Sequence, residues 1–267
     1  MRIYSHNIWG NFSSKECIGN RNYLIKELID GVNPDFCCFQ ECNPSTSRFG
    51  ETSISKLLLE CYEEVSFECA EKNFTPVFYK KNKFKLLDSS YVIFNGLNDW
   101  NSKSFTWGLF EEIETMKKVI IISVHLWWQY RGEVDIIQRR ENVSQLMEVV
   151  NRLFTKYNAP IIVAGDFNSG VNAKQGPDAY NVMVKNDMLD VRNISRETVD
   201  TETCASVYPL HTEDGIYYNG SSPSLTIDYI FLNKEELVKS LKFNIINSQK
   251  AKDSSDHLPL IYEFEIL

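Results

Sequence analysis

The sequence lacks the marks of several protein classes. It contains no Cys-x-x-Cys pair, and its four histidines do not cluster with its cysteines, so a zinc finger is not expected. Its seven cysteines are an odd number, which disfavours the evenly paired disulfide framework of a small secreted protein. Residues 1–9 contain no uninterrupted apolar stretch of the kind that a signal peptide needs, and no apolar run approaches the roughly 20 residues of a membrane span. These absences predict a reduced, cytoplasmic protein without a membrane span.

Positive charge is also scarce. The chain has 28 Lys and Arg against 36 Asp and Glu, a formal net charge of −8. Because non-specific affinity for nucleic acid comes mainly from Lys and Arg on phosphates, we expect no stable binding to duplex DNA. Chemistry on a phosphate remains open, since a bound divalent cation can supply positive charge locally.

The chain shows no sign of division into separate units. No Pro-, Gly- or Ser-rich linker, internal repeat or low-complexity tract interrupts the 267 residues. With 43% hydrophobic residues there is enough apolar material for one large core. We therefore expect a single domain over residues 1–267, and a monomer.

Short apolar runs outnumber amphipathic helices along the chain. The clearest helix is expected over about 132–157, where apolar residues recur at spacings of three and four, and another over 178–187. A long polar loop is expected over about 195–224, and Asn233 with Glu236 predicts the start of a short helix. Expected strands include residues 3–9, 35–40, 119–124, 160–164, 225–232 and 258–264. Many strands with few helices predict an α/β fold of two packed sheets with helices outside.

Nearly every expected strand ends, or is interrupted, at a polar side chain that can bind a metal or a phosphate. A carboxylate at the end of a core strand is costly unless it is paired or holds a cation. Acids on separate strands can converge on one rim of a sheet, which is how an oxygen-liganded Mg²⁺ or Mn²⁺ site is built. The side chains in question are Asn7, Gln40, Glu41, His125, Asp166, Asn168, Asp228, Asp256 and His257.

Each of these residues also has a structural explanation when taken alone. Glu41 can be a solvated residue that starts a loop, and His125 a core histidine with satisfied hydrogen bonds. Asp166 can shape an Asx turn in which Asn168 adopts a left-handed conformation. The occurrence of all the motifs in one order is what favours a shared site.

That ordered set of motifs resembles the endonuclease/exonuclease/phosphatase superfamily, the deoxyribonuclease I-like group. The motifs are Ser-His-Asn7, Gln40-Glu41, Ser-Val-His125, Gly-Asp166-Phe-Asn168, Ile-Asp228-Tyr-Ile and Ser-Asp256-His257. The resemblance implies a four-layer α/β sandwich, with two mixed β-sheets packed face to face and helices outside. It also implies a Mg²⁺- or Mn²⁺-dependent hydrolase, a phosphodiesterase or phosphatase in which an activated water attacks the phosphate in line.

The resemblance assigns a role to each residue of the set. Glu41 would be the principal metal ligand, with Asn7 binding metal or phosphate and Asp256 completing the acidic rim. Asp166 would orient or deprotonate the attacking water. Asn168 would donate to the phosphate or the nucleophile, and His125 would donate to phosphoryl oxygens or protonate the leaving group. Asp228 would hold His257 through one ring nitrogen and fix its tautomer, so that the other nitrogen of His257 faces the phosphate.

The substrate is less well specified than the phosphate site. Trp127, Trp128 and Arg131 follow His125 closely, and such a cluster can stack a base or cover a sugar. Alternatively, the two tryptophans alternate at a strand end, one buried and one half-exposed. The expected substrate is a nucleotide, a short nucleic acid or a small organophosphate. The alternatives are a DNA or RNA nuclease of the same fold, or a relative that binds a partner without catalysis.

Overall fold

The computed structural model describes residues 1–10, 15–43, 53–67, 72–174, 176–212, 214–220 and 224–267, with the side chains of the first helix described from residue 21 on. Two mixed sheets form the centre of the molecule. One has the strand order β10-β14-β15-β1-β2-β4-β3, and the other has the order β5-β6-β7-β8-β13-β9.

The first sheet comprises β10 (Glu197–Val199), β14 (Val238–Ile245), β15 (Leu260–Ile266), β1 (Arg2–Asn7), β2 (Phe36–Gln40), β4 (Val77–Lys80) and β3 (Tyr62–Glu64). The second comprises β5 (Phe84–Ile93), β6 (Ser104–Glu112), β7 (Lys118–His125), β8 (Ile161–Asp166), β13 (Asp228–Leu232) and β9 (Leu189–Asp190). Strands β1 and β2 run parallel to each other, as do β10 and β14 in the same sheet and β7 and β8 in the other, and antiparallel pairs complete both sheets.

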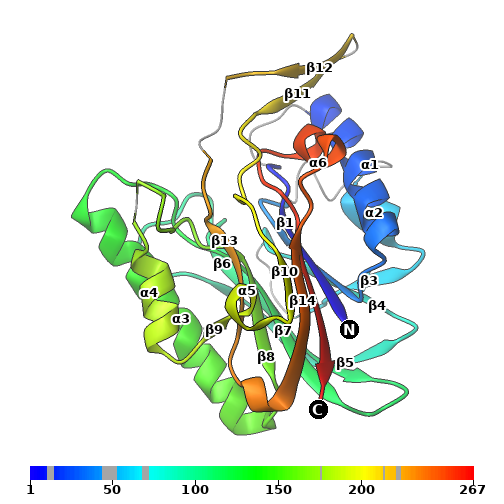
Figure 1. Cartoon of the computed structure of the whole chain (residues 1–267), viewed down its shortest axis with the longest axis vertical. Coiled ribbons are helices and arrows are strands. Elements are labelled where there is room, and N and C mark those ends of the chain that lie inside the picture. The colour runs from blue at the N-terminus through cyan, green and yellow to red at the C-terminus, as the bar shows by residue number, and fades with distance from the viewer. Residues whose placement is uncertain (11–14, 44–52, 68–71, 175, 213, 221–223) are drawn as a thin grey trace.

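Helices cover the outer face of each sheet (Figure 1). Helices α3 (Glu133–Tyr157) and α4 (Asp178–Lys185) lie on the second sheet, whereas α1 (Lys15–Val32), α2 (Ile54–Leu58) and α6 (Gln249–Ser254) lie on the side of the first. A short helix, α5 (Val191–Ile194), follows β9, and a separate hairpin, β11 (Pro209–Thr212) with β12 (Gly215–Tyr218), projects beside α1 and α6. The predicted four-layer α/β sandwich is confirmed.

Strand alternation divides the apolar residues into two main cores. In β7, Ile121 packs in the core between the two sheets, while Ile120 and Ile122 share the outer core with Val143 and Leu146 of α3. Successive side chains of a strand point to opposite faces, so a continuous run of isoleucines can serve both cores. The same alternation decides which polar side chains at the strand ends face inward.

Three sequence predictions differ from the structure. The strand expected over 225–232 begins only at Asp228, and the loop expected over 195–224 contains β10 and the β11–β12 hairpin. All four residues of β12 are exposed, so the sequence of this strand lacks the alternation of apolar and polar residues that predicts a half-buried strand. Asn233 does not cap a helix: its side-chain oxygen accepts a hydrogen bond from the Ile161 backbone N–H at 2.8 Å, and only a short 3-10 turn, Glu235–Leu237, follows. Among the described helices, none is both long and apolar enough to cross a membrane.

Candidate active site

The register of the strands brings the predicted residues to one end of the inter-sheet core. In the second sheet His125 pairs with Asp166, and Asp166 pairs with Asp228, so these three residues lie abreast on adjacent strands. In the first sheet Asn7 pairs with Gln40 in the same way. All five side chains are buried. The site therefore lies above the apolar core, where the two sheets face each other.

Asn7 links the two sheets at this position. Its amide Nδ2 donates to Asp166 Oδ2 at 3.0 Å and lies 3.3 Å from Glu41 Oε1. Its own Oδ1 accepts the backbone N–H of Trp9 at 3.0 Å, which fixes the amide orientation. Glu41, directly after β2, has a left-handed backbone with φ of 54°. Asn7 thus holds two carboxylates from different sheets on one amide group.

Two histidines complete the surroundings of Asp166. His125 Nε2 lies 3.5 Å from Asp166 Oδ2 and 3.9 Å from Glu41 Oε1. His257 Nε2 lies 4.0 Å from Asp166 Oδ2 on another side. Asp166 Oδ2 is therefore the atom around which the other groups gather.

His257 is fixed through both its ring and its backbone. Ring Nδ1 lies 2.9 and 3.1 Å from the two oxygens of Asp228, which sets Nδ1 as the protonated nitrogen and directs Nε2 toward Asp166. The backbone N–H donates to Ser255 Oγ, and the backbone carbonyl accepts from His6 Nε2 at 3.1 Å. Burial lowers the pKa of His257, but the Asp228 charge and hydrogen bond, together with the charges of Cys204 and Asp256, outweigh it and raise the pKa well above its usual value. The predicted pairing of Asp228 with His257 is thus present in the geometry.

Three acids at the site are held in an environment that disfavours their charged form. Burial raises the pKa of Glu41 and of Asp256, and burial together with the Asp228 charge raises the pKa of Asp166 to about 7. Glu41 Oε2 is buried without a hydrogen-bond partner among the described residues. A nearby cation would stabilise the ionised carboxylates, because it compensates the charge that burial leaves unsolvated.

The donor set suits a hard divalent cation. Carboxylate and amide oxygens are the ligands that Mg²⁺ and Mn²⁺ prefer, and the site offers Glu41, Asp166, Asp256 and Asn7. Among the described residues, ligand atoms of Asp166, Asp228 and His257 also lie within 4.8 Å of one another. This group does not include the predicted ligands Glu41, Asn7 and Asp256, and two of its members already hydrogen bond to each other. We therefore keep Glu41 and its neighbours as the predicted metal ligands.

Asn168 adopts the left-handed conformation of an Asx turn, the structural explanation given for it in the sequence analysis. Its φ is 48°, and its backbone N–H donates to Asp166 Oδ1 at 2.8 Å, as in an Asx turn. Its side-chain amide donates to the Leu126 carbonyl at 3.1 Å. The turn positions Asp166, and the role of Asn168 as a donor to phosphate stays a prediction.

The aromatic residues after His125 take different positions. Trp127 is 5% exposed and donates from Nε1 to Asp135 at 2.7 Å, and Arg131 pairs with the same carboxylate at 3.0 Å. Trp128 is 42% exposed, and its Nε1 donates to Asp99 at 3.0 Å. Trp127 and Arg131 thus both bond to Asp135 of α3, and Trp128 offers the accessible ring. Substrate binding by these three residues stays a prediction.

Lys103 is a charged residue beside the site that the sequence analysis missed. It is 3% exposed and comes one position before Ser104, which pairs with His125. Its ammonium is the charge with the largest effect on the pKa of both Glu41 and His125, which it lowers. Lys103 stands in a polar segment with no apolar periodicity, so nothing in the local sequence predicts that it is buried.

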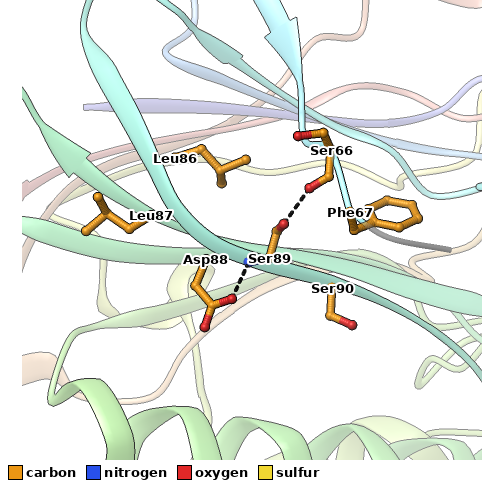
Figure 2. Close-up of a pocket in the computed structure, with 7 residues that line it drawn as sticks. All are labelled: Ser66, Phe67, Leu86, Leu87, Asp88, Ser89 and Ser90. Atoms are coloured by element: carbon orange, nitrogen blue, oxygen red, sulfur yellow. Dashed lines mark hydrogen bonds between the residues drawn. The ribbon is translucent and has the colours of Figure 1, made fainter.

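A surface pocket in another part of the molecule is separate from this group. Figure 2 shows it between Ser66–Phe67 and residues 86–90 of β5, an edge strand of the second sheet. Ser89 Oγ donates to the Ser66 carbonyl across it. The one carboxylate among its described lining residues, Asp88, pairs with Lys156 at 3.2 Å and accepts from the Tyr157 hydroxyl. The pocket contains none of the predicted site residues.

Comparison with known proteins gives a family and several similar folds. Residues 4–257 match the sequence pattern of the Endonuclease/Exonuclease/phosphatase family. An endonuclease/exonuclease/phosphatase from Bacteroides vulgatus is 20% identical, with a TM-score of 0.73 over 100% of this chain and 98% of that one. A Bacteroides thetaiotaomicron mannosyl-6-phosphatase is 18% identical, with a TM-score of 0.76 over 100% of both chains. The human Nocturnin catalytic domain, solved with a bound sulfate anion, is 19% identical, with a TM-score of 0.74 over 100% of this chain and 93% of that one. No curated protein matches the chain in sequence.

Proposed function

The chain belongs to the endonuclease/exonuclease/phosphatase family, and from this premise we propose that it is a divalent-metal-dependent phosphoester hydrolase. Members of the family are phosphoester hydrolases and generally depend on a divalent metal. The proposed substrate is a small phosphoester, a nucleotide or a short nucleic acid. Its class is supported by the acidic net charge, which disfavours tight binding to duplex DNA.

One observation supports the proposal more than any other. Asp166 lies in register between His125 and Asp228, while Asn7 from the opposite sheet donates to it. A carboxylate surrounded by two imidazoles and an amide can bind a water, take its proton and present it to an adjacent phosphate. The polar groups of a merely structural cluster would satisfy one another, whereas here Glu41 Oε2 and both ring nitrogens of His125 make no hydrogen bond with a described residue.

The residues divide the proposed reaction among them. Asp166 orients the attacking water and accepts its proton, and Asn7 keeps the Asp166 carboxylate in place. His257, with Nδ1 bound to Asp228, presents Nε2–H to the phosphate, where its positive charge opposes the charge that develops on the oxygens. His125 is neutral, because burial and the Lys103 and His257 charges lower its pKa well below the usual value, so it acts as a hydrogen-bond donor.

A bound Mg²⁺ or Mn²⁺ would supply Lewis-acid stabilisation of the phosphate and of the leaving oxygen. Glu41 with Asn7 and Asp256 would hold it. The orphaned Glu41 oxygen and the raised pKa values of Glu41 and Asp256 support this assignment.

The proposal is tested with purified protein on a panel of phosphoesters: activated monoesters and diesters, single- and double-stranded DNA, RNA and phosphoinositides. We expect hydrolysis of at least one small ester with Mn²⁺ or Mg²⁺, and loss of that activity on addition of a chelator with recovery on adding back the metal. No hydrolysis of any ester would contradict the enzymatic proposal. An unchanged rate with chelator would remove the metal from it.

A further inference from the structure

Lys103 is a buried cation at the edge of the proposed phosphate site. Its Nζ lies 3.4 Å from Ser102 Oγ and 3.5 Å from Asp99 Oδ1, both long contacts for an ammonium with three N–H donors. Burying a lysine is costly unless its charge is paired with an opposite charge and its N–H groups are hydrogen-bonded. Of the charged groups around Glu41 and His125, Lys103 has the largest effect on each, so its charge acts toward the centre of the site.

The segment that presents Lys103 is fixed in place. Asn98 accepts the Lys103 backbone N–H on Oδ1 at 2.9 Å and donates from Nδ2 to the Lys103 carbonyl at 2.9 Å, which closes the loop on itself. Gln138 of α3 accepts the Leu97 N–H at 2.6 Å and donates to the Asn95 carbonyl at 2.9 Å.

Gly96 makes the close approach of this loop to α3 possible. Its φ is +91°, and a Cβ there would lie 2.2 Å from Gln138 Oε1. The loop between β5 and β6 is therefore a rigid wall, and the position of Lys103 does not depend on a mobile segment.

Asp99 links the β5–β6 loop to Trp128, because it contacts both Lys103 and the Trp128 indole. It accepts the Trp128 indole N–H on Oδ2 at 3.0 Å, while Oδ1 faces Lys103. Trp128 follows β7 by three residues and is partly exposed. One carboxylate thus orients both a buried cation and an accessible indole ring.

Lys103 and His125 are brought to adjacent strands, because Ser104, one residue after Lys103, pairs with His125. His125 is buried, and neither of its ring nitrogens makes a hydrogen bond with a described residue. Among the described residues, the Lys103 ammonium has only the two long contacts to Ser102 and Asp99. An anion with several oxygens, placed beside them, would satisfy both groups.

We propose that Lys103 and His125 bind the non-bridging oxygens of a terminal phosphate, that the substrate is a phosphomonoester, and that its leaving group lies against Trp128. This inference rests on the proposed function, of which it specifies the substrate. A monoester phosphate carries about −1.5 to −2 charge near neutral pH, whereas a diester carries one negative charge and has a second organic group. The extra charge matches the Lys103 ammonium, so a monoester gains more from this contact than a diester does.

The test uses two substrates that differ by one methyl group and one charge, p-nitrophenyl phosphate and methyl p-nitrophenyl phosphate. The variants are Lys103→Met and Lys103→Gln, since Gln can still hydrogen bond to Asp99 and Ser102 and so separates loss of charge from loss of packing. Lys118→Met is the matched control: it removes the same charge from the opposite end of β7, where Lys118 is exposed.

We expect the wild type to prefer the monoester in kcat/KM. Both Lys103 variants should lose about 10- to 100-fold on the monoester, the range of a charged hydrogen bond, and less than about threefold on the diester, because little of the Lys103 charge is matched there. Lys118→Met should behave as the wild type. Equal losses on the two substrates, or no loss, would overturn the assignment of Lys103.

A binding measurement separates this inference from the proposed function. Inorganic phosphate at pH 8 should raise the melting temperature of the wild type, and both Lys103 variants should need about tenfold more phosphate for the same rise, as expected for loss of one charged contact. If the wild type hydrolyses neither of these esters nor any other ester of the panel, the proposed function fails while this measurement still decides the role of Lys103. The same phosphate requirement in all proteins would contradict it.

Discussion

Asp166→Asn is expected to lower kcat/KM by about 10²–10⁴-fold on any phosphoester that the protein hydrolyses, the usual contribution of a general base. The amide retains the shape of the carboxylate but has one oxygen. It can therefore accept a hydrogen bond from Asn7 or from the Asn168 backbone N–H, which donate to different oxygens of Asp166, but not from both. It cannot accept a proton from water. Steady-state kinetics with Mn²⁺ measure the effect, and a rate within threefold of the wild type would remove Asp166 from the proposed role.

The folding control for this variant follows from the raised pKa of Asp166. Its ordinary pKa is 3.8, and burial raises it to about 7, so between these values the folded protein binds a proton that the unfolded chain has released. Stability should therefore fall as pH rises through this window. Asn cannot titrate, so in the presence of a chelator Asp166→Asn should melt above the wild type at pH 8, with the difference shrinking toward pH 4. A variant that melts far below the wild type would attribute the lost activity to unfolding.

Asp228→Asn and His257→Gln are expected to lower kcat/KM by similar amounts, about 10²-fold or more each. Asp228 acts through His257: its two oxygens hold Nδ1 at 2.9 and 3.1 Å, and it keeps the imidazole protonated. Asn in its place offers one oxygen and no charge, so both the tautomer and the positive charge of His257 are less favoured.

The double variant distinguishes a coupled pair from two independent contributions. The effects of residues that act as a unit are strongly non-additive. The kcat/KM of the double variant Asp228→Asn with His257→Gln should therefore lie within about threefold of that of the slower single variant. Losses that multiply would contradict the pairing, and would assign Asp228 a separate role such as metal binding with Asp166 and His257.

The strands that carry the site could be predicted because their ends are chemically distinct. Buried apolar runs stop at His125 and at Asp166, and a carboxylate at such a point has few structural explanations. The predicted start of β13 is wrong because Leu225 and Ile227 are apolar but belong to the irregular segment that leads to Asp228. An apolar run in the sequence predicts that a segment is buried, but whether the segment is a strand depends on its backbone hydrogen bonds to a neighbouring strand.

The pairing of site residues depends on information that no single segment contains. That His125, Asp166 and Asp228 lie abreast follows from the register of three strands, two of them more than 60 residues apart in the chain. The sequence does not decide between a stacking and a buried position for Trp127 and Trp128, because alternation at a strand end does not say which side chain is buried. Lys103 escaped prediction because its burial results from a loop fixed against α3, a contact with Gln138 that no sequence pattern marks.

The central claim, that these acids form a cation site, is tested most directly by Mn²⁺-dependent melting of metal-free protein. A cation that binds only the folded state stabilises it by about 2.7 kcal/mol at 100 times its Kd, so the melting temperature of the wild type should rise with Mn²⁺. Glu41→Gln should need at least about tenfold more Mn²⁺, since it loses the charge of the proposed principal ligand, while Glu235→Gln, an exposed acid, should follow the wild type. A wild-type melting temperature that does not respond to Mn²⁺ or Mg²⁺, or an equal response in Glu41→Gln, would contradict the account.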